Sequence, residues 1–343
     1  MNKSFLKFFI TFFITMFITK INFAARLILI NGAGATFPYP IYSKWFYEYA
    51  KIDGTVNFNY QSIGSGGGIR QIIAQTVDFG ATDGPMTDKQ LKQAPGEILH
   101  IPMVAGAAVV AYNLEGLNKN LNFSPDVLAD IFLGKISKWN DKRIVKDNPG
   151  INLPDKKIIV VHRSDGSGTT YIFVDYLCEI SQKWKNTVGK DTSVNWPIGL
   201  GAKGNEGVAG LIKQTPNSIG YVELTYAIKN NIFYGAVKNK AGKFIIPNLE
   251  SITAAIASKT NDIPSDFRVS LVNPDGPDAY PIAGLTWILV YKKQIDKIKG
   301  EKIVKFLNWA ITDGQKYAED LLYAPLPTNL VSLIQKKIKE ISY

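Results

Sequence analysis

Four short turns contain the residue types that could do chemistry in this sequence. Each turn joins glycine or another small residue to a hydroxyl or a charged side chain, and one turn contains Arg163. Helix starts leave backbone N–H groups unpaired and partially positive, and glycine lets an anion approach those groups closely. Hydroxyls and a guanidinium add further donors. The pattern predicts a site for a small anion, formed by residues 35–37, 64–66, 82–83 and 163–169.

Each turn taken alone also has a structural interpretation. A glycine-serine turn is commonly only a turn. Residues 64–68 could form a flexible loop, and Arg163 with Asp165 could be an ion pair on the surface. A binding site is favoured because the four turns occupy matching positions in the predicted fold.

The segments before the turns have the patterns of strands. Residues 27–30, 56–60, 77–81 and 158–161 are short apolar or alternating runs, and each leads into one of the turns. Apolar residues at three- and four-residue spacing follow three of the turns and predict helices. Strand, turn and helix in this order predict an open α/β sheet, which binds ligands at the carboxyl ends of its strands.

The rest of the chain continues this alternation. We expect strands at residues 107–112 and 285–291, and a helix that begins after Ser124 and ends near Gly134. A chain of 343 residues is too long for one small doubly wound domain. We therefore expect two lobes, each an open, mostly parallel sheet flanked by helices.

Two crossovers should join the lobes, near residues 104–109 and 282–285. This division places residues 25–107 and 285–343 in lobe I and residues 108–284 in lobe II.

The N-terminus has the pattern of a secretory signal peptide. Two lysines precede an apolar run at residues 8–18, and small residues follow at Ala24 and Ala25. The run is too short to span a bilayer of about 30 Å as a helix. We expect residues 1–24 to be removed, with cleavage after Ala24 or Ala25, and the mature protein to be periplasmic. An uncleaved N-terminal anchor is the alternative.

Composition and charge favour a folded protein with anionic partners. The chain is 46% hydrophobic and 20% charged, and its formal net charge is +10. Residues 1–24 contain three lysines and no acid, so their removal leaves +7. A basic surface attracts anions in general. Because the lysines are scattered and do not alternate with aromatic side chains, we expect no nucleic acid partner.

The glycine-rich turns lack the catalytic motifs that would indicate an enzyme. Neither glycine-rich turn has the lysine of a P-loop or the spacing of a serine-hydrolase elbow. His100 and His162 are far apart in the sequence, so they predict neither a metal cluster nor a base for Cys178. Cys178 lies in an apolar helical stretch and is predicted to be a core thiol. We expect capture of the anion with no catalytic residue, no metal and no cofactor.

Several longer motifs together resemble one family. Gly-Ala-Gly-Ala-Thr-Phe-Pro occupies residues 32–38, and Gly-Ser-Gly-Gly-Gly residues 64–68. Further motifs occupy residues 77–83, 161–169, 195–199 and 219–223. The chain resembles the periplasmic phosphate-binding proteins of bacterial high-affinity phosphate ABC transporters, from about residue 32 to residue 327. The resemblance implies a two-lobe, type II periplasmic-binding-protein fold that closes on dehydrated inorganic phosphate.

The resemblance also implies the partners and the site. Besides phosphate, the implied partner is an inner-membrane phosphate ABC permease, and the implied state is a monomer. Phe37 and Gly168 would act through their backbone N–H groups, and Asp165 would orient the arginine. The implied phosphate ligands are Thr36, Phe37, Ser65, Asp83, Arg163, Ser167, Gly168 and Thr169.

Three positions depart from the family pattern. Gly66 stands where the family often has serine, and Gly84 where it often has alanine. Neither changes an implied contact. His162 takes a place that is often arginine, and it could alter the field at the edge of the site.

Asp83 points to the identity of the anion. A carboxylate beside an anion repels it unless the ligand carries a proton to donate. Phosphate at neutral pH retains such a proton, whereas sulfate would leave Asp83 facing a bare negative oxygen. The residues therefore favour phosphate, and a binder of the same fold for another tetrahedral oxyanion is the alternative.

Overall fold

The computed structural model describes residues 27–117 and 119–343. The predicted signal peptide lies outside the described residues. The strands are β1 (Ile28–Gly34), β2 (Val56–Ser62), β3 (Phe79–Thr82), β4 (Ile98–Asn113), β5 (Asn122–Phe123), β6 (Ile159–Arg163), β7 (Leu200–Ala202), β8 (Ser218–Glu223), β9 (Phe233–Tyr234), β10 (Ala236–Lys238), β11 (Phe244–Ile245) and β12 (Ala283–Tyr291).

Helices surround these strands. The α-helices are α1 (Tyr39–Ile52), α2 (Ser65–Ile73), α3 (Asp88–Gln93), α4 (Pro125–Phe132), α5 (Lys142–Asp147), α6 (Gly168–Ile180), α7 (Gln182–Thr187), α8 (Gly204–Gln214), α9 (Leu224–Lys229), α10 (Leu249–Ala257), α11 (Lys297–Ala310) and α12 (Thr328–Ile338). Short 3-10 helices are η1 (Thr260–Asp262), η2 (Asp313–Tyr317) and η3 (Glu319–Leu321). No helix in the described part of the chain is both long and apolar enough to cross a membrane.

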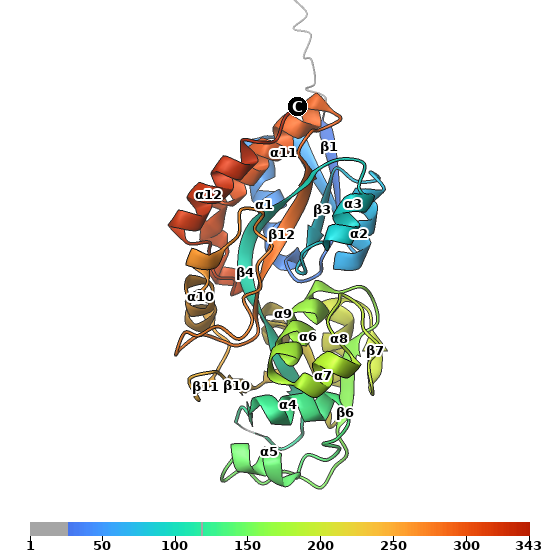
Figure 1. Ribbon diagram of the computed structural model, residues 1–343, viewed down its shortest axis with the longest axis vertical. Coiled ribbons are helices and arrows are strands. Elements are labelled where there is room, and N and C mark those ends of the chain that lie inside the picture. The colour runs from blue at the N-terminus through green and yellow to red at the C-terminus, as the bar shows by residue number, and fades with distance from the viewer. Residues whose placement is uncertain (1–26, 118) are drawn as a thin grey trace, which may run out of the picture.

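The strands form two lobes that share one long strand. The order across the main sheet is β2-β1-β3-β12-β4-β8-β6-β7, with β9 also paired to β4. In this sheet the parallel pairs are β1 with β2 and β3 in one lobe, and β6 with β7 and β8 in the other. Figure 1 shows β1, β3, α1, α2 and α11 in the upper body and α4 to α8 with β6 and β7 in the lower body.

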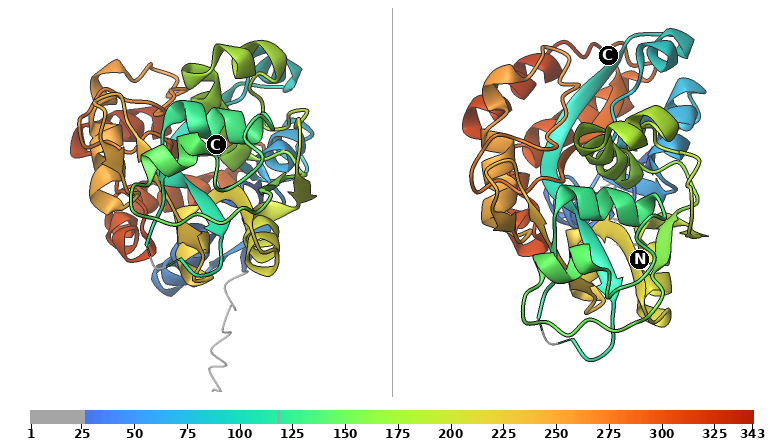
Figure 2. Two further views of the ribbon diagram at one scale, coloured as in Figure 1. Left: turned by 90° about the horizontal axis from the view of Figure 1, so that it is seen from below. Right: turned by 60° about the horizontal axis from the view of Figure 1, so that its bottom comes forward.

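Strand β4 connects the two lobes. It pairs antiparallel with β12 as far as Ala107 and with β8 from Ala108 onward. Figure 2 shows helices on either side of this strand. The sequence predicted only its second half as a strand. Pro102 interrupts the pattern because proline has no N–H to donate to a neighbouring strand. In the structure it lies beside the register shift between Thr286 and Trp287, where the irregular strand pairing accommodates it.

An aromatic cluster fills the core of the upper lobe. The helical spacing of α1 places Phe46 against Phe58 of β2 and Phe306 of α11, with ring centroids 4.9 and 5.3 Å apart. Trp45, on the same helix, is fully buried, and its Nε1 donates to Gly314 O at 2.7 Å. Each such aromatic pair contributes about 0.5–1.5 kcal/mol beyond the burial of its area. This packing fixes α1, and with it the turn that precedes α1.

Two local predictions had different outcomes. Cys178 is buried in α6, as its apolar surroundings predicted. Ser124 does occupy the N-cap of α4, but its side chain makes no capping bond. Instead, its backbone N–H donates to Asp147 Oδ2 at 2.7 Å, a contact between segments that the local sequence does not indicate.

We predict that adding one methyl group at Gly34 destabilises the protein, because β1 and β3 approach closely there. Gly34 has φ of +149°, and an added Cβ would overlap Ala81 O. Gly34→Ala should lower the free energy of unfolding by about 2 kcal/mol, measured by urea denaturation. Gly210, inside α8, has open space around an added Cβ, so Gly210→Ala should raise the same quantity by about 0.5–1 kcal/mol. Unchanged stability of Gly34→Ala would contradict the packing described here.

Candidate anion-binding site

The four polar turns meet where the two lobes face each other. Arg163, at the end of β6, donates from Nη1 to Thr36 Oγ1 at 3.2 Å. Near this bond, Gly66 N–H donates to Gly166 O at 2.9 Å. Thr36, Ser65, Asp83, Arg163, Ser167 and Thr169 are each at most 3% exposed. The structure therefore brings the predicted site residues together, with donors from both sides of the interface.

Unpaired backbone donors come from the turn before α1 and from the start of α6, and α2 also begins in this region. Helix α2 begins at Ser65, so residues 65–68 form its first turn and not the flexible loop that the glycines also allowed. Helix α6 begins at Gly168, and its N-cap Ser167 accepts from Thr170 N at 3.0 Å through Oγ. Among the described residues, no acceptor pairs with the backbone N–H groups of Phe37, Gly168 or Thr169. Such unpaired donors favour an anion.

Arg163 is held by a two-pronged ion pair. Its Nε donates to Asp165 Oδ1 at 2.7 Å and its Nη2 to Asp165 Oδ2 at 2.6 Å. The arginine side chain is 1% exposed and the aspartate 15%, so the alternative of a surface pair is wrong. Burial alone would raise the pKa of Asp165, but the bonds from Arg163 outweigh it and lower that pKa. Asp165 thus leaves Nη1 as the guanidinium nitrogen that bonds Thr36 of the first lobe.

Asp83 is a buried carboxyl with one unused oxygen. Its backbone N–H donates to Ser65 Oγ at 3.2 Å, and Ser65 Oγ lies 3.4 Å from Oδ2. Oδ1 is buried and has no hydrogen-bond partner among the described residues. Burial raises the pKa of Asp83 to about 7, against the opposing effects of Thr286, Arg163 and Ser65. An added Cβ at Gly168 would overlap Oδ2, so the start of α6 lies directly against this carboxyl.

Sequence reasoning missed several residues that support these turns. Asn205, in the first turn of α8, donates from Nδ2 to Thr36 Oγ1 at 2.8 Å and to Thr169 Oγ1 at 3.0 Å. Tyr226 Oη donates to Thr36 O at 2.7 Å. These residues come after the recognised turns in the sequence, and only the fold brings them back to the site.

A recognised motif contains two further supporting residues. Tyr221 and Glu223 belong to the motif at residues 219–223, which suggested the family but gave them no role. Tyr221 Oη accepts from Arg163 N at 3.2 Å and bonds Thr170 Oγ1 at 2.6 Å. Glu223 is fully buried, and its Oε2 accepts from Thr225 N at 3.0 Å. Burial raises the pKa of Glu223 to about 8.

His162 lies beside the site and not in it. Its ring stacks on Trp196, with centroids 4.8 Å apart and planes 13° apart, and its Nδ1 lies 3.0 Å from Arg163 O. Burial lowers the pKa of His162. The neutral form that this favours adds no charge beside Arg163.

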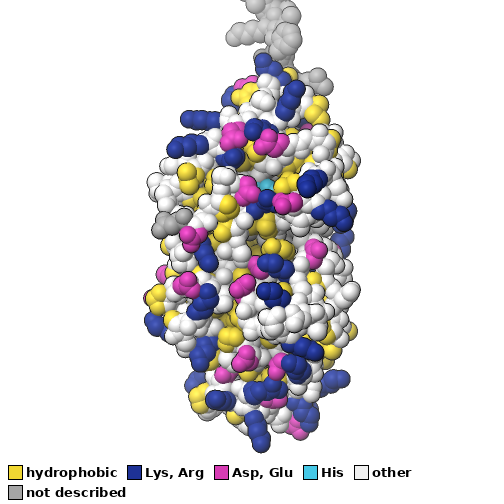
Figure 3. Space-filling model, viewed as in Figure 1, with side chains coloured by type: hydrophobic (Ala, Val, Ile, Leu, Met, Phe, Trp, Pro, Cys, Tyr) yellow, Lys and Arg dark blue, Asp and Glu magenta, His cyan; other side chains and the backbone are white. Residues whose placement is uncertain are grey.

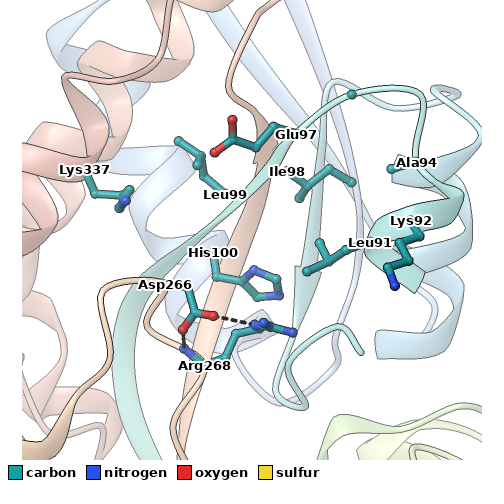
Figure 4. Close-up of a pocket in the computed structure, with 11 residues that line it drawn as sticks. Leu91, Lys92, Ala94, Glu97, Ile98, Leu99, His100, Asp266, Arg268 and Lys337 are labelled. Carbon is teal, nitrogen blue, oxygen red and sulfur yellow. Dashed lines mark hydrogen bonds and ion pairs between the residues drawn. The ribbon is translucent and has the colours of Figure 1, made fainter. Parts of the chain in front are cut away.

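A separate cavity lies away from the four turns. It measures about 450 Å³ and is lined by residues of α3, β4, α12 and the loop at residues 266–268, as Figure 4 shows. Two of its lining side chains bond the backbone of one residue: Met86 N donates to His100 Nε2, and Arg268 Nη1 donates to Met86 O, both at 3.0 Å. Burial lowers the pKa of His100 to about 3. None of the predicted site residues lines this cavity.

The arrangement is suited to holding an anion. It combines backbone N–H groups, hydroxyls and one guanidinium with a single carboxyl that could accept a proton. Among the described residues, no group of three or more His, Cys, Asp or Glu is placed to hold a metal ion. On the face in Figure 3, Lys and Arg are interspersed with Asp and Glu, so no broad patch of one sign competes with the site there.

Comparison with known proteins identifies the family. A family model described as a PBP superfamily domain matches residues 24–313. The phosphate-binding protein PstS of Xylella fastidiosa is 46% identical over 309 residues, which cover 90% of this chain and 84% of the relative. The chain belongs to the PstS family of phosphate-binding proteins. PstS of Pasteurella multocida is likewise 47% identical over 311 residues, covering 90% of each chain.

Solved structures share the fold at much lower identity. A phosphate-binding protein from Stenotrophomonas maltophilia has a TM-score of 0.68 at 18% identity, covering 90% of this chain and 93% of its own. A putative phosphate ABC transporter substrate-binding protein from Clostridium perfringens, with bound phosphate, has a TM-score of 0.64 at 15% identity, covering 87% and 100%. The predicted two-lobe periplasmic-binding-protein fold is confirmed.

We predict that Asp83 makes the phosphate-free protein less stable as pH rises. An unfolded aspartate ionises near pH 3.9, whereas the pKa of Asp83 is about 7. Between these values the folded state binds the extra proton, so this residue lowers the free energy of unfolding as pH increases. Asp83→Asn should flatten the dependence between pH 5 and 7 in urea titrations. Equal slopes for the variant and the wild type would contradict a buried, proton-binding Asp83.

Proposed function

We propose that this chain captures inorganic phosphate between its two lobes in the periplasm and delivers it to an ABC permease. The observation that carries the proposal is Asp83, a buried carboxyl with a free oxygen among groups that otherwise donate. Relatives named phosphate-binding protein PstS, 46–47% identical over 90% of the chain, support the same ligand.

The proposed ligand groups come from both lobes. The first lobe would supply hydroxyls, one backbone N–H and Asp83, and the second would supply Arg163, hydroxyls and the N-terminus of α6. Asp165 would orient Arg163 without touching phosphate. The proposed phosphate-binding residues are Thr36, Phe37, Ser65, Asp83, Arg163, Ser167, Gly168 and Thr169.

The hydrogen bonds that these donors can form would compensate for the free energy needed to remove water from phosphate. A buried anion is costly unless nearly all its oxygens are hydrogen-bonded. Hydrogen bonds to a charged group contribute about 1.5–3 kcal/mol each. Three unpaired backbone N–H groups, several hydroxyls and Nη1 of Arg163 would together offset that cost. Because the donors are split between the lobes, full coordination would require the closed arrangement.

Asp83 would make the site selective for an anion that carries a proton. Phosphate near neutral pH has one or two P–O–H groups, and one could donate to the carboxyl of Asp83. The carboxyl and phosphate would share one proton in the complex and titrate as a pair. Sulfate cannot donate to ionised Asp83, and the unmet charge would reject it. Another tetrahedral oxyanion would be accepted only if it also carries a proton.

We further propose how the chain divides into lobes and that it acts alone. Residues 25–107 and 285–343 would form lobe I and residues 108–284 lobe II, so that β4 passes between them at Ala107 and Ala108, where its partner strand changes. We propose a monomer that works without catalysis, metal or cofactor. Asp83 would share a proton with the ligand and would not attack it. The proposed ligand residues include no nucleophile paired with a base.

We predict that Asp83→Asn weakens the discrimination between phosphate and sulfate. An amide can donate to a bare oxygen, so the ratio of the two affinities should fall by at least about tenfold. Titration calorimetry at pH 8 with each anion, on protein first freed of phosphate, measures the ratio. Asp155→Asn makes the same change of charge at a side chain that is 63% exposed, and it should leave the ratio unchanged. Wild-type selectivity in Asp83→Asn would contradict the role of Asp83.

A further inference from the structure

Asn205 is a buried amide whose orientation is fixed by the backbone. It is fully buried, and its Oδ1 accepts from Glu223 N at 3.0 Å. A backbone N–H can only donate, so the amide oxygen must face it and Nδ2 must face the other way. Nδ2 carries two hydrogens, and it has two acceptors within reach, Thr36 Oγ1 at 2.8 Å and Thr169 Oγ1 at 3.0 Å. The amide therefore acts as a donor to both hydroxyls.

This arrangement uses up the accepting capacity of the Thr36 hydroxyl. A hydroxyl oxygen has two lone pairs and one hydrogen. Thr36 Oγ1 accepts from Asn205 Nδ2 at 2.8 Å and from Arg163 Nη1 at 3.2 Å, and Asn205 N lies 3.3 Å away. With both lone pairs engaged, the remaining capacity of this hydroxyl is its hydrogen, which must point away from these donors.

The same amide also bonds the hydroxyl of Thr169, which keeps one free lone pair and its hydrogen. Thr169 Oγ1 accepts from Asn205 Nδ2, and it donates to no acceptor among the described residues. Thr169 belongs to the first turn of α6, where its own backbone N–H and that of Gly168 have no acceptor among the described residues. One amide thus orients a hydroxyl from the turn before α1 and another from the start of α6.

We propose that Asn205 is a positioning residue that turns the hydroxyls of Thr36 and Thr169 into fixed donors toward the bound phosphate. The inference rests on the proposed function and deepens it. A free threonine hydroxyl can present either a lone pair or a hydrogen, and a lone pair repels an anion. Donors that are already aimed need no reorientation when the anion binds, which favours affinity. Asn205 does this without touching phosphate itself.

The same contacts make Asn205 sensitive to a change of one atom. In Asn205→Asp, one carboxylate oxygen can still accept from Glu223 N. The other oxygen would accept from the two threonine hydroxyls, and their hydrogens would then point away from phosphate. The variant keeps the shape of the side chain but reverses the polarity of both hydroxyls and adds a negative charge.

The test compares phosphate binding by Asn205→Asp, Asn205→Ala and the wild type in titration calorimetry. Asn205→Ala, which frees the hydroxyls to rotate, should weaken binding by about tenfold, and Asn205→Asp by at least about a hundredfold. If both variants bind within about threefold of the wild type, or if Asn205→Asp binds better than Asn205→Ala, the inference is overturned. A wild type that fails to bind phosphate would overturn the proposed function and this inference with it.

A double-mutant cycle separates positioning from a loss of stability. In a Thr36→Val background the hydroxyl is absent, so Asn205→Ala should cost clearly less phosphate affinity than in the wild type. Fully additive losses would overturn the inference even if Asn205→Asp fails to fold. Asn148→Ala is the matched control, because Asn148 is a buried asparagine whose side chain bonds Asn122 and Ile144, away from the proposed ligand residues. It should lower the melting temperature without changing the phosphate affinity.

Discussion

An anion can be buried only where donors replace the water that it loses, and this constraint governs the arrangement of both lobes. The unpaired N–H groups of Phe37, Gly168 and Thr169 exist because two turns place helix starts at the interface. Glycine at position 168 is needed because a Cβ there would overlap Asp83 and Ser65. The dense packing of small residues in these turns is thus a consequence of bringing backbone donors close to one point.

Positive and negative side chains balance one another at the site, so no large net charge builds up there. The guanidinium of Arg163 is paired with Asp165 on two of its nitrogens, and the buried Asp83 has a raised pKa. A net charge of +10 for the whole chain therefore says little about the site itself. In the proposed function, the direction of each donor and one shared proton would decide which anion binds. This is a stricter criterion than attraction between opposite charges.

Thr36 is the residue on which the contacts between the lobes converge. Arg163, Asn205 and Tyr226 all bond to it, through Oγ1 or through its carbonyl oxygen. The single strand β4 runs through both lobes, and its change of partner at Ala107 and Ala108 leaves each lobe with its own ladder. Each lobe can then hold its donors rigidly while the contacts at Thr36 depend on how closely the lobes approach.

The sequence by itself determined the local parts, because strand patterns and turn chemistry depend on neighbouring residues. It predicted the α/β class, the four turns and the burial of Cys178, and its motifs indicated the family. It could not predict the first half of β4, because Pro102 breaks the strand pattern there. The irregular pairing with β12 that accommodates this proline joins residues far apart in the sequence. Nor could it assign Asn205, Tyr221 or Tyr226, since the residues that they bond at the site lie between 36 and 190 residues away along the chain. Only the tertiary structure decided which side chains aim the predicted donors, because hydrogen-bond direction depends on atoms that meet only after the lobes come together.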